Sequence, residues 1–514
     1  MEVIKNIIEY LSIIIAVTLL VIMTYRLVNV LQQGHYHYSN FYLVFKYHYY
    51  RRGLFLIPLI MLFWMNLWYV QLIFILYGTF ISFYLFIKKP IVELKITARI
   101  CRLFFTLFIV TTVMGTLLHY WFLLPELVSS ALILYIILPL LICISFFINY
   151  PLEISITKYY QQLAKKKLKK YNTNVIGISG SFGKTSTKSF LYCFLKETEM
   201  TMATPQSYNT LNGVSLSINE WLLPVYYYFI AEMGASRSGD IRKLNKLLSP
   251  KYGIITAIGP QHLKTFKSID NVIDEKMQLI NNLPKEGIGV INIDDENIRN
   301  YNLTTQAKIV TFGINEKADY QAFNINTSVK GLHFRIKHQQ GETDVSTQVL
   351  GFHNIYNILA AFAMAMELGV SKEEIVFQTS VLEPIKNRLS IRKERGFTIL
   401  DDSFNSNYNG FINALDVLKK YKNPRILITP GIVDLGKMEK AINTSLANRI
   451  SEVCHFVVLI KSKPAKQIKD GLDAIFYKKY IVVANYKKAI AYVKTMHKNG
   501  TILIENDIGD IYKI

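Results

Sequence analysis

Hydrophobic residues are concentrated in the first 150 residues of the chain, where long apolar stretches are separated by short polar ones. A stretch of roughly 17–25 apolar residues is long enough to cross a bilayer as a helix. We count about five such stretches, near 8–25, 53–69, 71–87, 103–123 and 128–149. The second and third form one run too long for a single crossing, with Asn66 and Gln71 at the expected turn. Residues 1–150 are therefore predicted to form a membrane domain, an all-α transmembrane bundle.

From about residue 172 the pattern changes to short apolar runs that alternate with helical stretches. This alternation is typical of a doubly wound α/β domain. Expected strands lie at 175–178, 227–232, 253–257 and 289–293. Because the carboxyl ends of strands in open α/β sheets bind ligands, polar residues at these ends are candidate site residues. Glu232 ends the second of these strands, and a segment with a histidine follows the third.

Lysine and arginine positions predict how the helices are oriented. Basic residues follow the first, third and fifth apolar stretches, at Arg26, Lys46, Arg51 and Arg52, at Lys88, Lys89, Lys95, Arg99 and Arg102, and at Lys158, Lys165, Lys166, Lys167, Lys169 and Lys170. The alternate loops near 66–71 and 119–127 carry none, and the N-terminus carries only Lys5. The positive-inside rule then predicts a multi-pass protein of the cell membrane with its N-terminus outside and residues 151–514 in the cytoplasm.

The formal net charge of +21 could indicate a nucleic-acid or a membrane partner. Nucleic-acid binding would show a basic stripe interleaved with stacking aromatic residues. The basic residues instead gather at membrane boundaries, as in the linker 151–171, so we expect anionic headgroups and no nucleic acid. The four cysteines are isolated and contain no CxxC pair, so neither a zinc ribbon nor a disulfide framework is indicated.

Residues 175–187, VIGISGSFGKTST, are the most informative segment for function. A short apolar strand is followed by glycines at every third position and then by Lys184 and Thr185. Glycines let backbone N–H groups turn toward a phosphate, and the next helix adds its positive N-terminal end. The lysine of such a loop reaches the β/γ-phosphates, and the hydroxyl after it ligates Mg²⁺. The alternative is a glycine-rich turn without a ligand. The candidate ATP-binding residues are Gly180, Ser181, Gly183, Lys184, Thr185 and Ser186.

The spacing of this loop resembles the Mur ligases, which are ATP-dependent amide-forming enzymes of bacterial cell-wall synthesis. A strict P-loop has glycine where this chain has Ile178, and the Mur loop is similarly one residue longer. The resemblance implies a central ATP-binding domain at 172–385 and a Rossmann-like C-terminal domain at 386–514. It also implies that ATP phosphorylates a carboxylate and that an amine then attacks the acyl phosphate.

The resemblance further implies a metal site with Thr185, Glu232, His262 and Lys276. The segment 231–241, AEMGASRSGDI, resembles the family's E-x-G segment, whose glutamate ligates Mg²⁺. His262 begins a segment similar to H-L-x-x-F-x-S, and Lys276 lies fourteen residues later. In the family a lysine at this place is carbamylated by CO₂ and ligates a second Mg²⁺. The alternative for Lys276 is a solvated lysine on an amphipathic helix. The catalytic candidates are Lys184, Glu232, His262 and Lys276.

Three further segments resemble parts of the family that contact nucleotide or substrate. Residues 207–218, SYNTLNGVSLSI, are similar to a substrate loop of the branch that adds the last dipeptide to the peptidoglycan stem. Residues 351–369 resemble G-x-H-N-x-x-N-x-x-A-A, which places His353, Asn354 and Asn357 beside the adenine and phosphates. Residues 387–418 resemble the start of the C-terminal domain, with Arg388 as linker arginine and Asp402 as a ribose-side contact.

The resemblance has two departures, and both concern substrate binding. Family members usually begin with a domain that binds the uridine diphosphate of the precursor, whereas here membrane helices precede the ATP-binding domain. The segment 505–510, ENDIGD, also replaces a lysine-glycine-serine stretch of the dipeptide-adding enzyme. We therefore expect a ligase that joins an amino acid or dipeptide to a lipid-linked envelope precursor. The alternatives are a D-alanyl-D-alanine-adding ligase acting on a UDP-linked muramyl peptide, an amino-acid ligase for capsule or another surface polymer, and a non-catalytic scaffold of a wall-synthesis complex.

Overall fold

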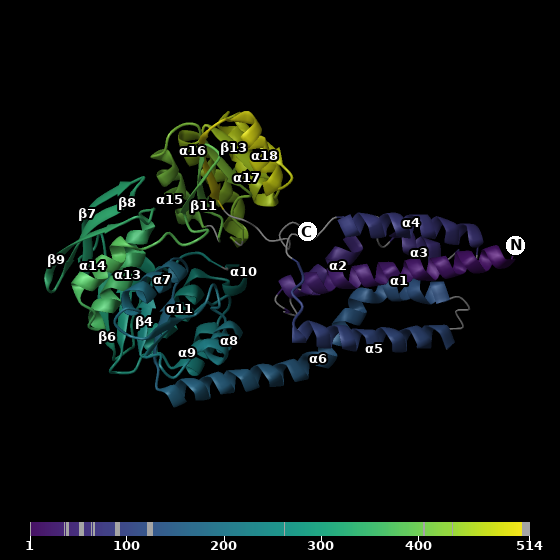
Figure 1. Cartoon of the computed structure of the whole chain (residues 1–514), viewed down its shortest axis with the longest axis horizontal. Coiled ribbons are helices and arrows are strands. Elements are labelled where there is room, and N and C mark those ends of the chain that lie inside the picture. The colour runs from purple at the N-terminus through teal and green to yellow at the C-terminus, as the bar shows by residue number, and fades with distance from the viewer. Residues whose placement is uncertain are drawn as a thin grey trace. The chain divides into compact units, whose positions relative to one another are not determined.

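The computed structural model describes residues 2–505 apart from 35, 37–40, 51–55, 63, 65–66, 88–92, 121–126, 262, 405–406 and 434, and it leaves out the side chains of 49, 50, 56, 62, 264 and 437. The chain divides into two compact units, the first up to Thr157 and the second from Lys158 onward. The first unit is helical and the second is built on two sheets (Figure 1).

The described residues of the first unit form helices α1 (Glu2–Gln33), α2 (Phe41–Tyr50), α3 (Leu56–Leu62), α4 (Trp68–Ile87), α5 (Ala98–Tyr120) and the first part of α6 (Leu127–Tyr171). Four of them, α1, α4, α5 and α6, are long and apolar enough to cross a membrane. The second predicted span coincides with α3, which has seven residues, and with residues outside the described part. At 1.5 Å per residue α3 is much shorter than the hydrocarbon core of a bilayer. The expected five spans thus reduce to four among the described helices, and the orientation of the N-terminus stays a prediction.

Small and charged residues hold the helices of the first unit together. Gly78 of α4 packs so closely on α1 that an added Cβ would lie 2.2 Å from the Ile15 side chain. Glu153 of α6 binds two arginines of α5, with 3.7 Å to Arg99 Nε and 2.7 Å to Arg102 Nε. The apolar stretches thus pack as a bundle, and an ion-pair cluster ties α5 to α6.

The predicted basic linker is helical, because residues 151–171 continue α6 without a break. In the second unit its side chains Ala164 and Leu168 are buried in the same core as Val214 and Ile218 of α8 (Leu211–Trp221). The amide of Gln161 also donates a 3.2 Å hydrogen bond to Asn212. Helix α6 is therefore part of the packing of the second unit.

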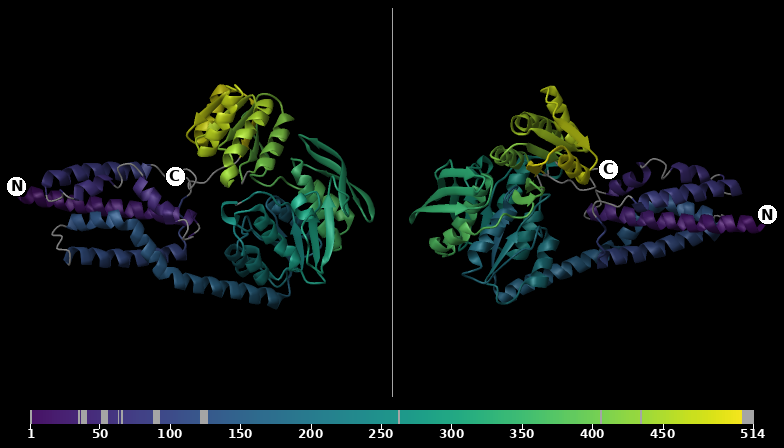
Figure 2. Two further views of the ribbon diagram at one scale, coloured as in Figure 1. Left: turned by 180° about the vertical axis from the view of Figure 1, so that it is seen from behind. Right: turned by 45° about the horizontal axis from the view of Figure 1, so that its top comes forward.

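The larger sheet of the second unit has nine strands in the order β2-β3-β1-β4-β5-β6-β7-β8-β9 (Figures 1 and 2). All pairings are parallel up to β7, and β7, β8 and β9 are antiparallel. The central strands are buried on both faces and so read as continuous apolar runs. The strands are β1 (Asn174–Ser179), β2 (Thr201–Ala203), β3 (Tyr228–Glu232), β4 (Tyr252–Ile255), β5 (Ile288–Asn292), β6 (Lys308–Gly313), β7 (Tyr320–Ser328), β8 (Gly331–His338) and β9 (Gly341–Thr347).

Two hydrophobic cores cover the faces of this sheet. One contains α7 (Lys184–Leu195) and α13 (His353–Glu367), whose alanines at 360, 361, 363 and 365 are fully buried. The other contains α6, α8, α9 (Asp240–Leu248) and α11 (Ile269–Asn281). Ser268 begins α11 by accepting a hydrogen bond from the Asn271 N–H, as N-cap serines do. Shorter helices are α10 (Leu263–Phe266), α12 (Glu296–Arg299) and α14 (Lys372–Ser380).

The smaller sheet begins after α14, close to the predicted domain boundary at 385. Its order is β10-β11-β15-β12-β13-β14, and only β10 and β11 pair antiparallel. This arrangement agrees with the expected Rossmann-like domain. The elements are β10 (Ser390–Glu394), β11 (Phe397–Asp402), α15 (Tyr408–Lys419), β12 (Arg425–Thr429), the 3₁₀ helix η2 (Gly436–Met438), α16 (Glu439–Val453), β13 (Phe456–Ile460), α17 (Lys463–Ala474), β14 (Tyr480–Val483), α18 (Tyr486–Met496) and β15 (Gly500–Glu505).

Candidate active site

The predicted phosphate loop connects β1 to α7 in a strand–loop–helix arrangement. Gly180 has a φ of +146° and Gly183 a φ of +83°, both in the region that favours glycine. A Cβ on Gly180 would lie 2.1 Å from Thr256 Oγ1, and one on Gly183 would lie 2.2 Å from Asn357 Oδ1. Ser181 holds the loop to the strand end after β4, since its N–H donates to Ala257 O at 2.6 Å. These glycines are therefore needed both for backbone conformation and for space.

Two lysines point at the same carbonyl oxygen of this loop. Lys184 Nζ lies 2.7 Å and Lys276 Nζ lies 2.9 Å from Gly180 O. Burial lowers the pKa of Lys184 to about 8, and Arg388 adds to this lowering while Glu232 opposes it. Burial also lowers the pKa of Lys276 well below its usual value, and the charge of Lys184 lowers it further. Lys276 is only 1% exposed, so it is not a solvated lysine on an amphipathic helix.

Glu232 lies at the carboxyl end of β3 and is almost completely buried. Its Oε1 accepts a 2.9 Å hydrogen bond from Asn209 Nδ2, and its Oε2 lies 3.1 Å from Lys188 Nζ. Burial alone would raise the pKa of Glu232, but the charges of Lys188 and Lys184 and the Asn209 hydrogen bond outweigh it and hold the pKa low. Glu232 is thus an ionised carboxylate beside the phosphate loop.

Lys188 was not predicted from the sequence, although it contacts a predicted site residue. Besides Glu232, its Nζ contacts two backbone oxygens, Thr204 O at 2.8 Å and Gln206 O at 2.6 Å. It therefore joins α7 to the end of β3 and to the segment that leads to Asn209. Its position one helical turn after Lys184 places it on the same face of α7, which is the signal that could have identified it.

We expect the substitution Lys188→Met to lower the stability of the protein by about 3–5 kcal/mol, because it leaves the Glu232 carboxylate buried without its cation. The measurement is the denaturant midpoint of the detergent-solubilised full chain. The matched control is Lys196→Met, at the exposed end of the same helix, which should change stability by less than about 1 kcal/mol. Equal midpoints for the two variants would contradict the contact described for Lys188.

Of the predicted metal ligands, Thr185 and Glu232 are oxygen ligands whose contacts the structure describes. Thr185 Oγ1 accepts a 3.0 Å hydrogen bond from an Arg388 Nη. A hydroxyl and a carboxylate are oxygen ligands of the kind Mg²⁺ prefers, so Thr185 and Glu232 fit this ion. His262 lies outside the described residues. Among the residues that are described, no three His, Cys, Asp or Glu side chains gather at one point, so this site would depend on Thr185 and on a modified Lys276.

Helix α13 brings the predicted His353, Asn354 and Asn357 to the loop. Asn357 Oδ1 lies 3.4 Å from Thr187 Oγ1, and its Nδ2 donates to Asn354 Oδ1 at 2.9 Å. Asn354 in turn donates to Leu350 O at 2.7 Å, so it holds Asn357 and does not line the pocket described below. Burial, assisted by the Arg388 charge, lowers the pKa of His353 to about 4, which leaves the imidazole neutral at pH 7.

A pocket of about 830 Å³ opens beside the loop, between the two sheet domains of the second unit. This volume is within the usual range for small-molecule sites. Gly183, Ser186, His353 and Asn357 line it from the first domain, and Arg388 and Asp402 line it from the linker and the second domain. Burial raises the pKa of Asp402 to about 7 although Arg388 opposes the shift. Gly180, Ser181, Lys184, Thr185, Glu232 and Lys276 are not part of this lining.

Another set of lining residues was missed by the sequence interpretation. Asn292, Asp294 and Asp295 follow β5 directly, and Tyr356 faces them from α13. Asp294 accepts hydrogen bonds from the Ile314 N–H at 2.7 Å and from Tyr356 Oη at 2.8 Å. Polar residues at the end of an apolar strand were the available signal, since this is the ligand-binding edge of the sheet.

Two protein-family models match the second unit, and together they cover more than half of the chain. The Mur ligase middle domain matches residues 178–365, and the Mur ligase glutamate ligase domain matches residues 387–505. The chain is 34% identical over 282 residues to the UDP-N-acetylmuramoyl-tripeptide--D-alanyl-D-alanine ligase of Buchnera aphidicola, covering 54% of this chain and 61% of that protein. It is 30% identical over 297 residues to the ligase of the same name from Haemophilus influenzae, covering 57% and 64%. The chain thus matches less than two thirds of the length of these two relatives.

Two solved structures of Mur ligases superpose on this chain and share its fold. A crystal structure of MurF from Acinetobacter baumannii superposes with a TM-score of 0.61 at 25% identity, covering 68% of this chain and 76% of that one. The MurF ligase of Thermotoga maritima in complex with ADP superposes with a TM-score of 0.62 at 24% identity, covering 69% and 81%.

Proposed function

The chain belongs to the Mur ligase family, and we propose from this premise that it is an ATP-dependent ligase that joins a carboxylate to an amine through an acyl phosphate. Several cationic side chains are concentrated around one backbone loop, and this supports the proposal. Lys184 and Lys276 contact Gly180 O, Lys188 contacts Glu232, and Arg388 contacts Thr185. Lys184, Lys188 and Arg388 outnumber the ionised Glu232 even without Lys276, so the site favours a multiply charged anion such as the triphosphate of ATP.

The loop and its lysine would bind the phosphates of ATP. The first backbone N–H groups of α7 have no partner within the helix, and together with the positive end of the helix dipole they favour a bound anion. Lys184 would exchange its bond to Gly180 O for the β/γ-phosphates, and the added negative charge would raise its pKa above the present value of about 8.

Thr185 and Glu232 would hold Mg²⁺, because they supply a hydroxyl and an ionised carboxylate beside the loop. Mg²⁺, when bound, supplies positive charge at the phosphate oxygens. Arg388 at present donates to Thr185 Oγ1, so this guanidinium would have to leave the hydroxyl. Arg388 also faces the pocket, where it could then contact a phosphate of ATP.

Lys276 is proposed to carry a carbamate formed with CO₂. Only a neutral amine attacks CO₂, and burial together with Lys184 lowers the pKa of Lys276 and so increases the neutral fraction. As the N–C bond forms, the nitrogen loses one proton to solvent, and the product would be an anion next to Lys184. It would thus replace a repulsion between two lysines by an attraction. His262 is proposed as a further contact of the same site.

The pocket supports a reaction that excludes water. His353 and Asn357 are proposed to contact the adenine and phosphates, and Asp402 the ribose, so that both domains would enclose the nucleotide. An acyl phosphate hydrolyses readily in water, and closure of the two domains would protect it until the amine attacks.

The comparisons favour D-alanyl-D-alanine as the amine, because the relatives named above add this dipeptide to a UDP-linked muramyl tripeptide. The four apolar helices favour an envelope precursor at the membrane as the carboxylate. We therefore propose a cell-membrane ligase whose second unit is cytoplasmic. The acceptor is proposed to be lipid-linked, and the UDP-linked precursor is the alternative that the relatives support.

Two other functions are less well supported. An amino-acid ligase for capsule or another surface polymer has no support from the relatives, and a non-catalytic scaffold would not need buried Lys184, Glu232 and Lys276.

The test uses the purified full chain in detergent with ATP, Mg²⁺ and D-alanyl-D-alanine. The acceptor is either a UDP-linked or a lipid-linked muramyl peptide, and products are identified by mass and by ADP release. Product with the lipid-linked acceptor alone supports the full proposal. Product with the UDP-linked acceptor supports the dipeptide-adding reaction and contradicts the lipid requirement. If ADP forms with neither acceptor, the proposed substrate class is wrong.

A further inference from the structure

Large apolar side chains gather on the surface of the second unit where α8 leads into β3. Met200, Trp221, Leu223, Val225 and Tyr227 are each between 46% and 57% exposed. They lie together, because the Tyr227 N–H donates to Met200 O at 2.8 Å and the Tyr226 N–H donates to Leu223 O at 3.2 Å. Soluble surfaces rarely expose such a contiguous group, so it indicates an interaction site.

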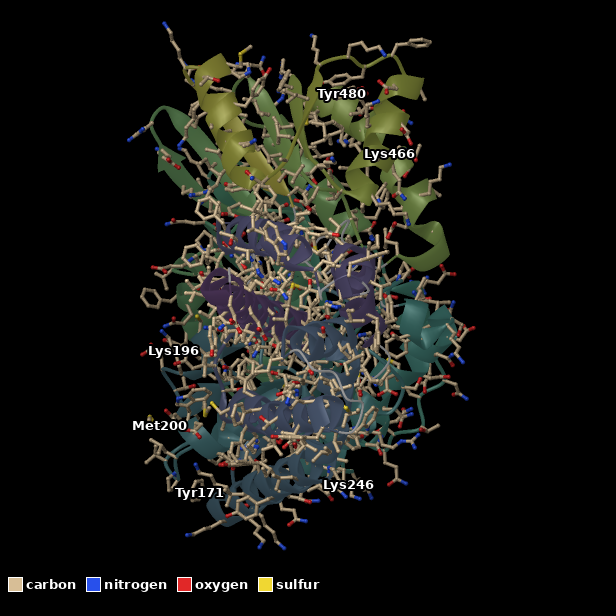
Figure 3. All side chains as sticks on the ribbon, turned by 90° about the vertical axis from the view of Figure 1, so that its right-hand side faces the viewer. Tyr171, Lys196, Met200, Lys246, Lys466 and Tyr480 are labelled. Atoms are coloured by element: carbon tan, nitrogen blue, oxygen red, sulfur yellow. The ribbon has the colours of Figure 1, made fainter. Side chains whose placement is uncertain are left out.

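The basic half of α6 lies directly beside this group. Lys167 Nζ donates to Asn219 O at 2.8 Å, and Thr173 Oγ1 donates to Tyr226 O at 3.1 Å. Figure 3 shows Tyr171, at the end of α6, on the same edge of the unit as Met200, whereas Tyr480 lies at the opposite edge. Ala164 and Leu168 are buried, whereas Leu163, Lys166 and Lys170, at spacings of three and four residues, are among the exposed positions of α6. We name this surface the Trp221 face: Leu163, Lys166, Lys170, Met200, Trp221, Leu223, Val225 and Tyr227.

The charge around the Trp221 face is positive. The exposed lysines of α6 nearby are Lys165, Lys166, Lys169 and Lys170. The carboxylates on the neighbouring segments are Glu199 and Glu220, both exposed, and Glu197, which pairs with Lys196 at 3.4 Å. The lysines therefore outnumber the carboxylates that are free to oppose an anionic partner.

We propose that the Trp221 face binds the surface of an anionic bilayer. Tryptophan and tyrosine favour the headgroup level of a membrane, aliphatic side chains enter the acyl boundary, and lysines attract anionic headgroups. The inference rests on the proposed membrane anchoring. Helix α6 continues from the apolar segment into the second unit, so anchoring would keep this face at a high effective concentration near the bilayer.

This contact would hold the second unit in one orientation on the bilayer. Pro151 lies inside α6, after the apolar segment and before the basic half, where a missing backbone N–H permits a bend. The face adjoins the amino ends of β1, β2 and β3, so the phosphate loop, which follows the carboxyl end of β1, would lie at the opposite edge of the sheet. A second unit held only by α6 could instead sample many orientations.

The experiment places a polarity-sensitive fluorophore at Leu223→Cys in the full chain, after Cys101, Cys143, Cys193 and Cys454 are replaced by serine or alanine. The matched control is Phe476→Cys, which is 83% exposed and lies in the other sheet domain. Both proteins are reconstituted into phosphatidylcholine vesicles with or without phosphatidylglycerol, and quenching by a quencher attached to lipid is measured. A further variant changes Lys165, Lys166, Lys169 and Lys170 to glutamine and leaves Lys167 intact.

We expect the Leu223 label, and not the Phe476 label, to be quenched by the lipid quencher at least about threefold more in phosphatidylglycerol vesicles than in phosphatidylcholine vesicles. The glutamine variant should lose most of this difference. Equal quenching of the two labels in both lipids would overturn the proposal. The proposal would also be overturned if the fluorophore at position 223 reported an apolar environment in detergent without lipid. That result would indicate that a protein contact covers this position. Extraction of the chain into buffer without detergent would instead show that the anchoring itself is wrong.

Discussion

Lys184→Ala should reduce ATP turnover by about two to three orders of magnitude or more, because it removes the cation proposed to stabilise charge on the transferred phosphoryl group. Lys184 Nζ lies 2.7 Å from Gly180 O. Lys276 contacts the same oxygen but comes from another helix and is proposed to carry a carbamate, so it would not replace the lost positive charge. The measurement is ADP release by the detergent-solubilised full chain in the presence of acceptor and dipeptide. The control is Lys196→Ala, which lies at the exposed end of the same helix.

The Lys184 variant must also keep its fold for the result to be informative. Its denaturant midpoint should remain close to that of the wild type, since the substitution removes a buried cation whose pKa is already lowered by burial. Wild-type ADP release by Lys184→Ala would show that the loop does not carry the reaction. That outcome would favour the scaffold among the alternatives.

Lys276→Ala should likewise abolish ligation, and short carboxylic acids should partly restore it. The substitution leaves space beside Gly180 O where acetate or propionate could take the place of the carbamate anion. The wild type should lose activity in CO₂-free buffer and regain it with bicarbonate. Both effects are measured as ADP release, with Lys285→Ala after α11 as the exposed control.

A different result is expected if Lys276 acts only as a cation. Lys276→Ala would then be inactive without rescue by carboxylates, and the wild type would not respond to bicarbonate. This outcome would contradict the carbamate, although the phosphate loop and the proposed ligase would stand.

Much of the second unit was predictable because buried parallel strands give continuous apolar runs. The expected strands at 227–232, 253–257 and 289–293 correspond to β3, β4 and β5 within one residue at the start and two at the end. The loop between β1 and α7 could be placed because phosphate binding, the function proposed for it, needs glycine, lysine and threonine at fixed spacing. The membrane segments were found by length and hydropathy, but these do not show where a helix ends, so α3 is shorter than expected.

The contacts that complete the site could not be predicted from local patterns. Gly183 needs its missing Cβ because of Asn357, which lies far along the chain on another helix. Lys188 resembles any lysine of an amphipathic helix until β3 and the segment before Asn209 fold against it. Asp294 gains its role from backbone N–H groups after β6. These partners are brought together by the sheet topology, which no single segment encodes.

We propose that the chain activates a carboxylate by phosphorylation before it forms the amide. The most direct test supplies the acceptor with ¹⁸O in its carboxylate and analyses the phosphate released by the full chain together with ADP. If an acyl phosphate forms, one ¹⁸O atom is transferred to phosphate for each amide formed. Phosphate without ¹⁸O, released while amide accumulates, would contradict the acyl phosphate and the function proposed for this site.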